Sequence, residues 1–76
     1  MRLGARIKRE RERHGWSQNE LGRRAHVRQA LLSELESGKR NDTPTSVLRR
    51  LARTLGVSMD YLAGLYDDED PARAVA

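Results

Sequence analysis

Residues 17–38 read SQNELGRRAHVRQALLSELESG, and this stretch contains two short amphipathic segments separated by a break in the helical pattern. The Ser17 hydroxyl is placed to cap the first segment by accepting a hydrogen bond from the amide of Glu20. The Glu20 carboxylate is placed to bind the Ser17 amide in return, which completes a capping box. The pattern therefore predicts a helix over about residues 18–25.

The second segment, over about residues 28–36, has one apolar face. Its leucines recur at the spacing of an amphipathic helix: Leu31, Leu32 and Leu35. Gly38 follows as a residue suited to the left-handed conformation that ends helices. A turn of about three residues around His26 fits between the two segments. The stretch is thus typical of a helix-turn-helix pair.

The opposite face of the second helix carries small or hydrogen-bonding side chains. On a helical wheel they share the outer arc: Gln29, Ala30, Ser33, Glu34 and Ser37. Small side chains let a helix backbone approach another surface closely, although exposed polar arcs are also the norm on solvated helices. The charge of the chain favours a surface that contacts another molecule over an ordinary solvated face.

The charge of this 76-residue chain is unevenly distributed. Residues 1–66 carry 14 basic and 7 acidic residues, whereas residues 67–76 carry one basic and four acidic residues. A compact basic body indicates a polyanionic partner, and nucleic acid is the commonest one. We expect residues 1–66 to form one domain and residues 67–76 to form an acidic, disordered tail.

The remaining segments complete an all-α fold of five helices. A charged helix is expected over residues 2–14, ended by Gly15, and a fourth helix is expected to be capped by Thr45. Ser58 is expected to cap a short last helix. No apolar run reaches the roughly 20 residues of a membrane span and no signal peptide is visible, so we expect a cytoplasmic protein without membrane contact.

Three motifs occur in order between about residue 7 and residue 62. They are I-x3-R-x3-G-W-S-Q-x2-L, V-x4-L-x2-L-E-x-G-K-R and L-x3-L-G-V-S-x-D-Y-L. In these motifs and their spacing the chain resembles the lambda-repressor-like, Cro/XRE-type helix-turn-helix family. The resemblance implies a compact five-helix domain that binds double-stranded DNA as a homodimer, in a protein of bacterial or phage origin that associates with the nucleoid when bound.

The resemblance also implies which residues contact the bases of DNA. They lie in the second helix of the pair: Gln29, Ala30, Ser33 and Glu34. Arg28 stands where the family usually has Ser or Thr, and we favour a DNA contact for it over a merely solvated side chain, because arginine to guanine is the commonest specific contact. Glu34 would repel phosphate but can accept a hydrogen bond from a cytosine amino group.

Contacts to the DNA backbone are implied at two places. Ser17 and Gln18 begin the first helix of the pair, where free amides suit an anion. Lys39, Arg40 and Asn41 begin the loop after the second helix, for which a solvated loop is the alternative. The arginines of the fourth helix are expected to act as surface charges without fixed contacts: Arg49, Arg50 and Arg53.

Arg11 and Glu36 are expected to form a partly buried, structural ion pair, because the family places an arginine at the position of Arg11. His26 stands where the family has its turn glycine, and we expect it in a left-handed conformation. Gly22 replaces the usual alanine and should weaken its helix by about 1 kcal/mol. Glu10 stands where leucine is frequent, which predicts loose packing of the first helix.

Three classes of function compete. The first is a sequence-specific transcriptional regulator, most simply a repressor, whose dimer contact would involve Leu65 and Tyr66. The second is an antitoxin or adaptor that uses the same fold to bind a protein partner. The third is an enzyme, which we set aside because the chain has no Cys, no paired His and no phosphate-binding loop. No cofactor and no metal site are expected.

Overall fold

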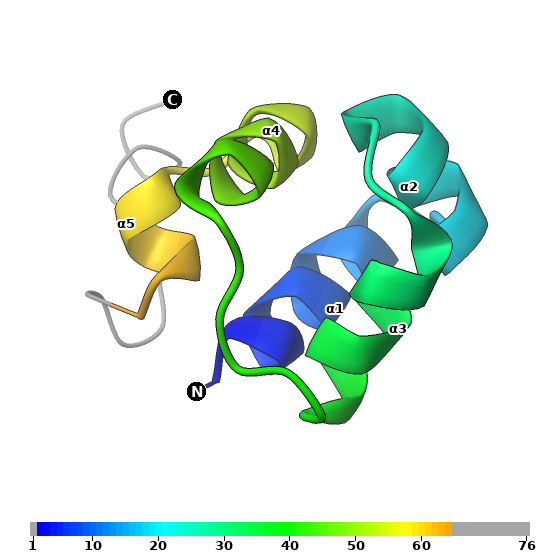
Figure 1. Cartoon of the computed structure of the whole chain (residues 1–76). Helices are drawn as coiled ribbons and strands as arrows, with labels where there is room; N and C mark the ends of the chain where they lie inside the picture. The colour runs from blue at the N-terminus through cyan, green and yellow to red at the C-terminus, as the bar shows by residue number, and fades with distance from the viewer. Residues whose placement is uncertain (1, 65–76) are drawn as a thin grey trace.

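The computed structural model describes residues 2–64. These residues form five helices: α1 (Leu3–Arg13), α2 (Gln18–Ala25), α3 (Gln29–Ser37), α4 (Thr45–Leu55) and α5 (Met59–Leu62). No strand occurs within this described part of the chain. The predicted all-α, five-helix fold is confirmed, and Figure 1 shows α2 and α3 joined by a short turn.

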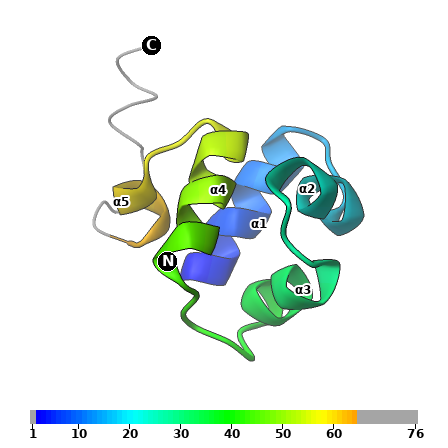
Figure 2. The same ribbon diagram turned by 45° about the horizontal axis from the view of Figure 1, so that its top comes forward.

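The helices enclose one apolar core to which all five contribute. α1 packs against α3, α4 and α5, while α2 packs against α3 and α4. Figure 2 shows α1 and α4 side by side, with α3 at the edge of the bundle. The buried apolar side chains are Ile7, Leu21, Ala25, Val27, Leu32, Leu35, Val47, Leu51, Ala52, Leu55, Val57, Tyr61 and Leu62. None of the helices in residues 2–64 has the length and apolarity needed to cross a membrane.

One half of the predicted capping box is present at α2. The Ser17 hydroxyl accepts a hydrogen bond from the Glu20 amide at 3.0 Å. The other half is wrong, because the Glu20 carboxylate binds the guanidinium groups of Arg23 and Arg24 instead of the Ser17 amide. Charged donors three and four residues ahead on a helix compete well against a neutral amide. Desolvation raises the pKa of Glu20, but these two hydrogen bonds outweigh it and hold the pKa below its ordinary value of 4.5.

The start of α4 differs from the prediction. Thr45 is the first residue of the helix and not its cap, and Pro44 occupies the capping position with no side-chain hydrogen bond. The proline ring fixes φ, here at −55°, and ψ of 145° keeps the residue extended. Its carbonyl accepts the first hydrogen bonds of the helix, from the amides of Val47 and Leu48 at 3.0 Å. The expected cap at α5 is confirmed, since the Ser58 hydroxyl accepts from the Tyr61 amide at 3.0 Å.

Gly22 permits a close approach that an alanine would obstruct. A Cβ atom at this position would lie 2.6 Å from the backbone carbonyl oxygen of Val27. The expected weakening of α2 is therefore only part of the role of Gly22, because the turn folds back onto the helix here and leaves no room for a Cβ atom. His26, in the same turn, has the expected left-handed conformation with φ of 58°.

Glu10 lies in a buried polar contact between α1 and α5, so the expectation of loose packing there is wrong. It is 1% exposed and accepts a hydrogen bond from the Tyr61 hydroxyl at 2.9 Å. Arg9 donates to the same hydroxyl. The Arg6 guanidinium, also 1% exposed, lies 5.0 Å from the centroid of the Tyr61 ring. One oxygen of this buried carboxylate, Oε2, accepts the hydrogen bond from the tyrosine hydroxyl and lies 3.7 Å from Arg9 Nε and 3.6 Å from Arg13 Nη1.

Candidate nucleic-acid interface

Helix α3 presents one face to solvent while the opposite face is anchored in the core. Leu32 and Leu35 are buried, whereas Gln29 and Ala30 are exposed. Ser33 and Glu34 are half-buried on the same outer side. The residues expected to contact bases therefore line a continuous face at the edge of the bundle, where a second macromolecule can approach without displacing core side chains.

Arg28 begins α3 as its N-terminal capping residue, and its side chain makes no capping hydrogen bond. Its backbone carbonyl accepts from the amides of Leu31 and Leu32, at 3.1 and 3.2 Å. The Arg28 side chain is exposed and has no hydrogen bond or ion pair with any of residues 2–64. Its guanidinium is therefore available to an external anion or base.

Arg11 and Glu36 join α1 to the C-terminal half of α3 through two hydrogen bonds. Arg11 Nε donates to Glu36 Oε2 at 2.8 Å, and Arg11 Nη2 donates to Glu36 Oε1 at 2.9 Å. The two side chains are 12% and 4% exposed. The hydrogen bonds to Glu36 raise the pKa of Arg11 above its ordinary value. Arg11 Nη1 also donates to the carbonyl oxygen of Trp16 at 2.8 Å, so a single guanidinium connects α1, the start of α2 and α3.

A chain of amide hydrogen bonds extends this pair to the outer face of α3. Gln18 Nε2 donates to Glu36 Oε1 at 3.2 Å. Gln18 Oε1 in turn accepts from Gln29 Nε2 at 2.7 Å. The structure thus brings together Gln18, expected at a phosphate, and Gln29, expected at a base, and the buried ion pair positions both of them. Side chains that are already oriented lose less entropy when they bind.

Glu34 is paired with Arg40, a contact that the sequence did not indicate. Arg40 Nε lies 3.3 Å from Glu34 Oε1, and the Arg40 amide donates to the Glu34 carbonyl at 3.1 Å. Both side chains are about half exposed, at 49% and 46%, so the pair adds little to stability. Its effect is electrostatic, because the single carboxylate on the outer face of α3 is partly neutralised by a neighbouring cation.

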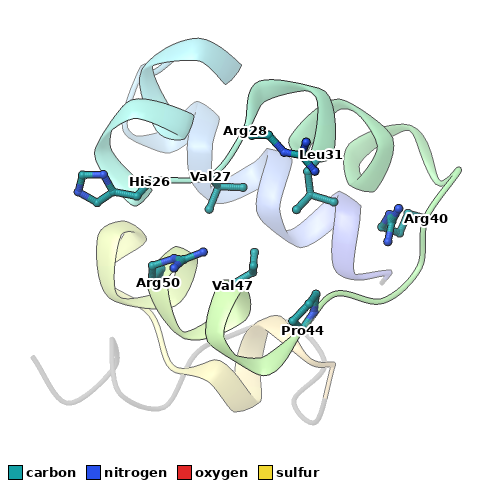
Figure 3. A pocket seen from close by; sticks show the side chains of 8 residues that line it. All are labelled: His26, Val27, Arg28, Leu31, Arg40, Pro44, Val47 and Arg50. Carbon is teal, nitrogen blue, oxygen red and sulfur yellow. The ribbon is translucent and has the colours of Figure 1, made fainter.

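Two open hollows flank α3. The first, of about 360 Å³, lies between α3 and α4 and is shown in Figure 3. It is lined by His26, Val27, Arg28, Leu31, Arg40, Pro44, Val47 and Arg50. The second, of about 240 Å³, lies between α3 and α1 and is lined by Lys8, Arg11, Gln18, Ser33, Glu36 and Ser37. Two basic residues that were not among the expected site residues line these hollows, Arg50 the first and Lys8 the second.

The other expected site residues have the following positions. Ser17 is exposed, with its hydroxyl engaged in the cap of α2. Lys39 and Asn41 are exposed in the loop after α3. Leu65 and Tyr66, expected at a dimer contact, lie outside the described residues. Within residues 2–64 no three side chains of the metal-ligating types gather closely enough to hold a metal ion.

Comparison with known proteins yields matches in sequence and in structure. The model of the family described as helix-turn-helix matches residues 7–62. The N-terminal DNA binding domain of SinR from Bacillus subtilis has a similar structure, with a TM-score of 0.80, 29% identity, and coverage of 90% of this chain and 96% of that chain. A chain of the SinR protein/SinI protein complex has a TM-score of 0.79 and 27% identity, covering 96% of this chain and 72% of that chain. No curated protein matches this chain.

Proposed function

This chain belongs to the Cro/XRE-type helix-turn-helix family of DNA-binding transcriptional regulators, and we propose that it is a repressor that binds a pseudo-palindromic operator as a homodimer. The observation that carries the proposal is the outer face of α3, which is open to solvent and bordered by cations on both sides. A helix of this kind fits the major groove, where base edges differ for each base pair.

In the proposed complex the first turn of α3 contacts base edges. Arg28 donates to a guanine or a nearby phosphate, and Gln29 pairs through its amide with an adenine. Ala30 is small enough to meet a thymine methyl group. Ser33 and Glu34 lie one turn further along, where Glu34 accepts from a cytosine amino group once Arg40 turns toward the DNA backbone.

The proposed backbone contacts come from both ends of the helix-turn-helix pair. Ser17 and Gln18 approach one phosphate at the start of α2, and Gln18 is already hydrogen-bonded to Gln29 in the free protein. Lys39, Arg40 and Asn41 approach the other strand from the loop after α3. Such contacts set the register of the protein on the duplex but carry no sequence information themselves.

A homodimer would double this surface around a two-fold axis. We propose that Leu65 and Tyr66 contribute to the contact between the two copies, since they are apolar and come three and four residues after the end of α5 in the chain. In such a dimer the two copies of α3 enter successive major grooves on one side of the duplex. Repression would then follow from occlusion of the promoter by the bound dimer.

The proposal is tested by selecting preferred sequences from random duplex DNA at fixed salt concentration. The expected result is a pseudo-palindrome whose half-sites lie about 10 base pairs apart, centre to centre. Gln29→Ala should relax the preference at one position of each half-site, while Arg53→Ala on the exposed side of α4 should leave the preference intact. A flat preference with steep dependence on salt would contradict the proposal, because it would leave only charge-driven binding.

A protein partner is the second candidate, and the similarity to a chain of the SinR protein/SinI protein complex favours it. In this alternative the domain is an antitoxin or adaptor, and DNA binding is secondary to recognition of another protein. The two candidates differ in the selection experiment, since an adaptor would return no ordered DNA preference.

A further inference from the structure

The hollow between α3 and α4 has a basic rim and an apolar floor. Arg28 and Arg50 lie on opposite sides of it, one at the start of α3 and the other on α4, as Figure 3 shows. Val27, Leu31 and Val47 also line the hollow, and Val27 lies between the two arginines in this view. We propose that this hollow binds a phosphate group of the operator backbone and that Arg50 is a further DNA contact. The inference rests on the proposed function, because it takes α3 to be the helix in the major groove.

The charge of the hollow is largely uncompensated. Arg50, like Arg28, has no hydrogen bond or ion pair with any of residues 2–64. Arg40 at the rim is shared with Glu34, so three guanidinium groups face one carboxylate. The planar donors of arginine match the oxygens of a phosphate group. A single anion between Arg28 and Arg50 would relieve the repulsion of two cations that share this hollow.

The floor of the hollow strengthens the attraction for an anion. Val27 and Val47 are buried, at 6% and 9% exposed, and Leu31 is half-buried. Charges that meet above an apolar surface are screened less than charges in open water, so each guanidinium interacts more strongly with a phosphate there than on a flat exposed face. The volume of about 360 Å³ leaves room for the phosphate and part of the adjoining sugar.

The position of the hollow relative to α3 agrees with the geometry of the major groove. At about 100° per residue, Leu31 lies about 160° around α3 from Ser33, so the two hollows border α3 on different sides. A helix in the major groove has one sugar-phosphate backbone on each side, about 12 Å apart. In the proposed complex Gln18 therefore contacts a phosphate of one DNA strand and Arg50 contacts a phosphate of the other.

The experiment compares Arg50→Ala with Arg53→Ala, an arginine on the same helix that is exposed and does not line the hollow. Affinity for the selected operator and for unrelated duplex DNA is measured at several salt concentrations. One lost phosphate contact should reduce the slope of log K against log salt by about 0.9, which corresponds to about eightfold weaker binding at about 0.1 M salt and about fourfold at about 0.2 M. Both DNAs should lose affinity by the same factor, and Arg53→Ala should bind as the wild type does.

Uncharged methylphosphonates, placed one at a time in the operator, would identify the phosphate. At that position the neutral group should weaken binding of the wild type but not of Arg50→Ala. If Arg50→Ala and Arg53→Ala bind alike while the wild type selects a pseudo-palindrome, the contact at Arg50 is refuted and the proposed function stands. If the wild type selects no sequence, the proposed function itself fails.

The alternative ligand for this hollow is a free phosphate ion instead of a phosphate group of the DNA backbone. Inorganic phosphate at constant ionic strength would then shift the methyl resonances of Val27 and Val47 in the wild type and not in Arg50→Ala, while the operator affinity of Arg50→Ala stayed at the wild-type value. That combination would overturn the proposal. Thermal unfolding of both variants checks that neither loss of an exposed arginine has changed the fold.

Discussion

Replacement of Arg11 by alanine should destabilise the domain severely. The change leaves the Glu36 carboxylate, 4% exposed, with Gln18 Nε2 at 3.2 Å as its remaining side-chain donor, and it removes the donor to the Trp16 carbonyl. Removing one partner of a buried ion pair costs about 3–5 kcal/mol, because the other charge remains buried. A domain of this size has a total stability of roughly 4–11 kcal/mol. The variant should therefore lose between about a quarter and all of its free energy of unfolding.

Urea unfolding followed by helical circular dichroism measures this loss. With an m-value of about 1–2 kcal/mol per molar urea, the midpoint should fall by roughly 1.5–5 M. Arg23→Ala is the matched control, because Arg23 binds Glu20 in a surface pair and is 75% exposed. Loss of a surface pair costs at most about 1 kcal/mol.

A second variant separates the charge effect from the packing effect. Changing Arg11 to Met and Glu36 to Leu together should recover most of the loss, since no charge is then left buried without its partner. The reasoning is refuted if Arg11→Ala unfolds within 1 kcal/mol of the wild type, or if the double variant is as unstable as the single one.

Three other predictions concern the supporting structure. Glu20→Gln should be less stable than the wild type near pH 7, because the lowered pKa of Glu20 means that folding favours its charged form. The gap should narrow as the pH falls below 4.5 and Glu20 is protonated, and a gap that urea unfolding shows to be unchanged as the pH is lowered would contradict this. Tyr61→Phe should cost about 1.5–3 kcal/mol in the same assay, because buried Glu10 loses a hydrogen bond, and a cost near zero would show that Glu10 does not depend on it. Gly22→Ala should lower the melting temperature, because its Cβ would meet the Val27 carbonyl, whereas helix propensity alone predicts stabilisation of about 1 kcal/mol.

Features that depend on residues close in the chain were predicted well. The cap at Ser17, the left-handed turn at His26 and the end of α3 at Gly38 all appear in the structure as expected. These features rest on backbone conformations and hydrogen bonds within one turn of a helix, for which the local sequence supplies both partners. The cap of α4 lies one position before the expected Thr45, at Pro44, where no side chain can accept a hydrogen bond and the local pattern of capping residues gives no signal.

Features that depend on residues far apart in the chain required the fold. Glu10 and Tyr61 are separated by 51 positions, and no periodicity indicates that a tyrosine hydroxyl will meet a carboxylate in the interior. Similarly, a helical wheel shows that Arg50 is exposed but not that it lines one hollow together with Arg28. The exposure of a residue can be predicted from its position on one helix, whereas a hollow between two helices depends on how both of them pack.

By itself, the sequence determined that the chain forms five helices, that two of them are joined by a tight turn, and that the outer face of α3 is free of core side chains. Amphipathic spacing, capping residues and basic charge suffice for these conclusions because each acts over a few residues or over the whole composition. The packed fold was needed to show that Gln18 and Gln29 are hydrogen-bonded, that Arg40 pairs with Glu34, and that Arg50 lines a hollow beside α3. These contacts depend on how the helices pack and on which side-chain rotamers the packing leaves open, and neither can be obtained from the pattern along a single helix.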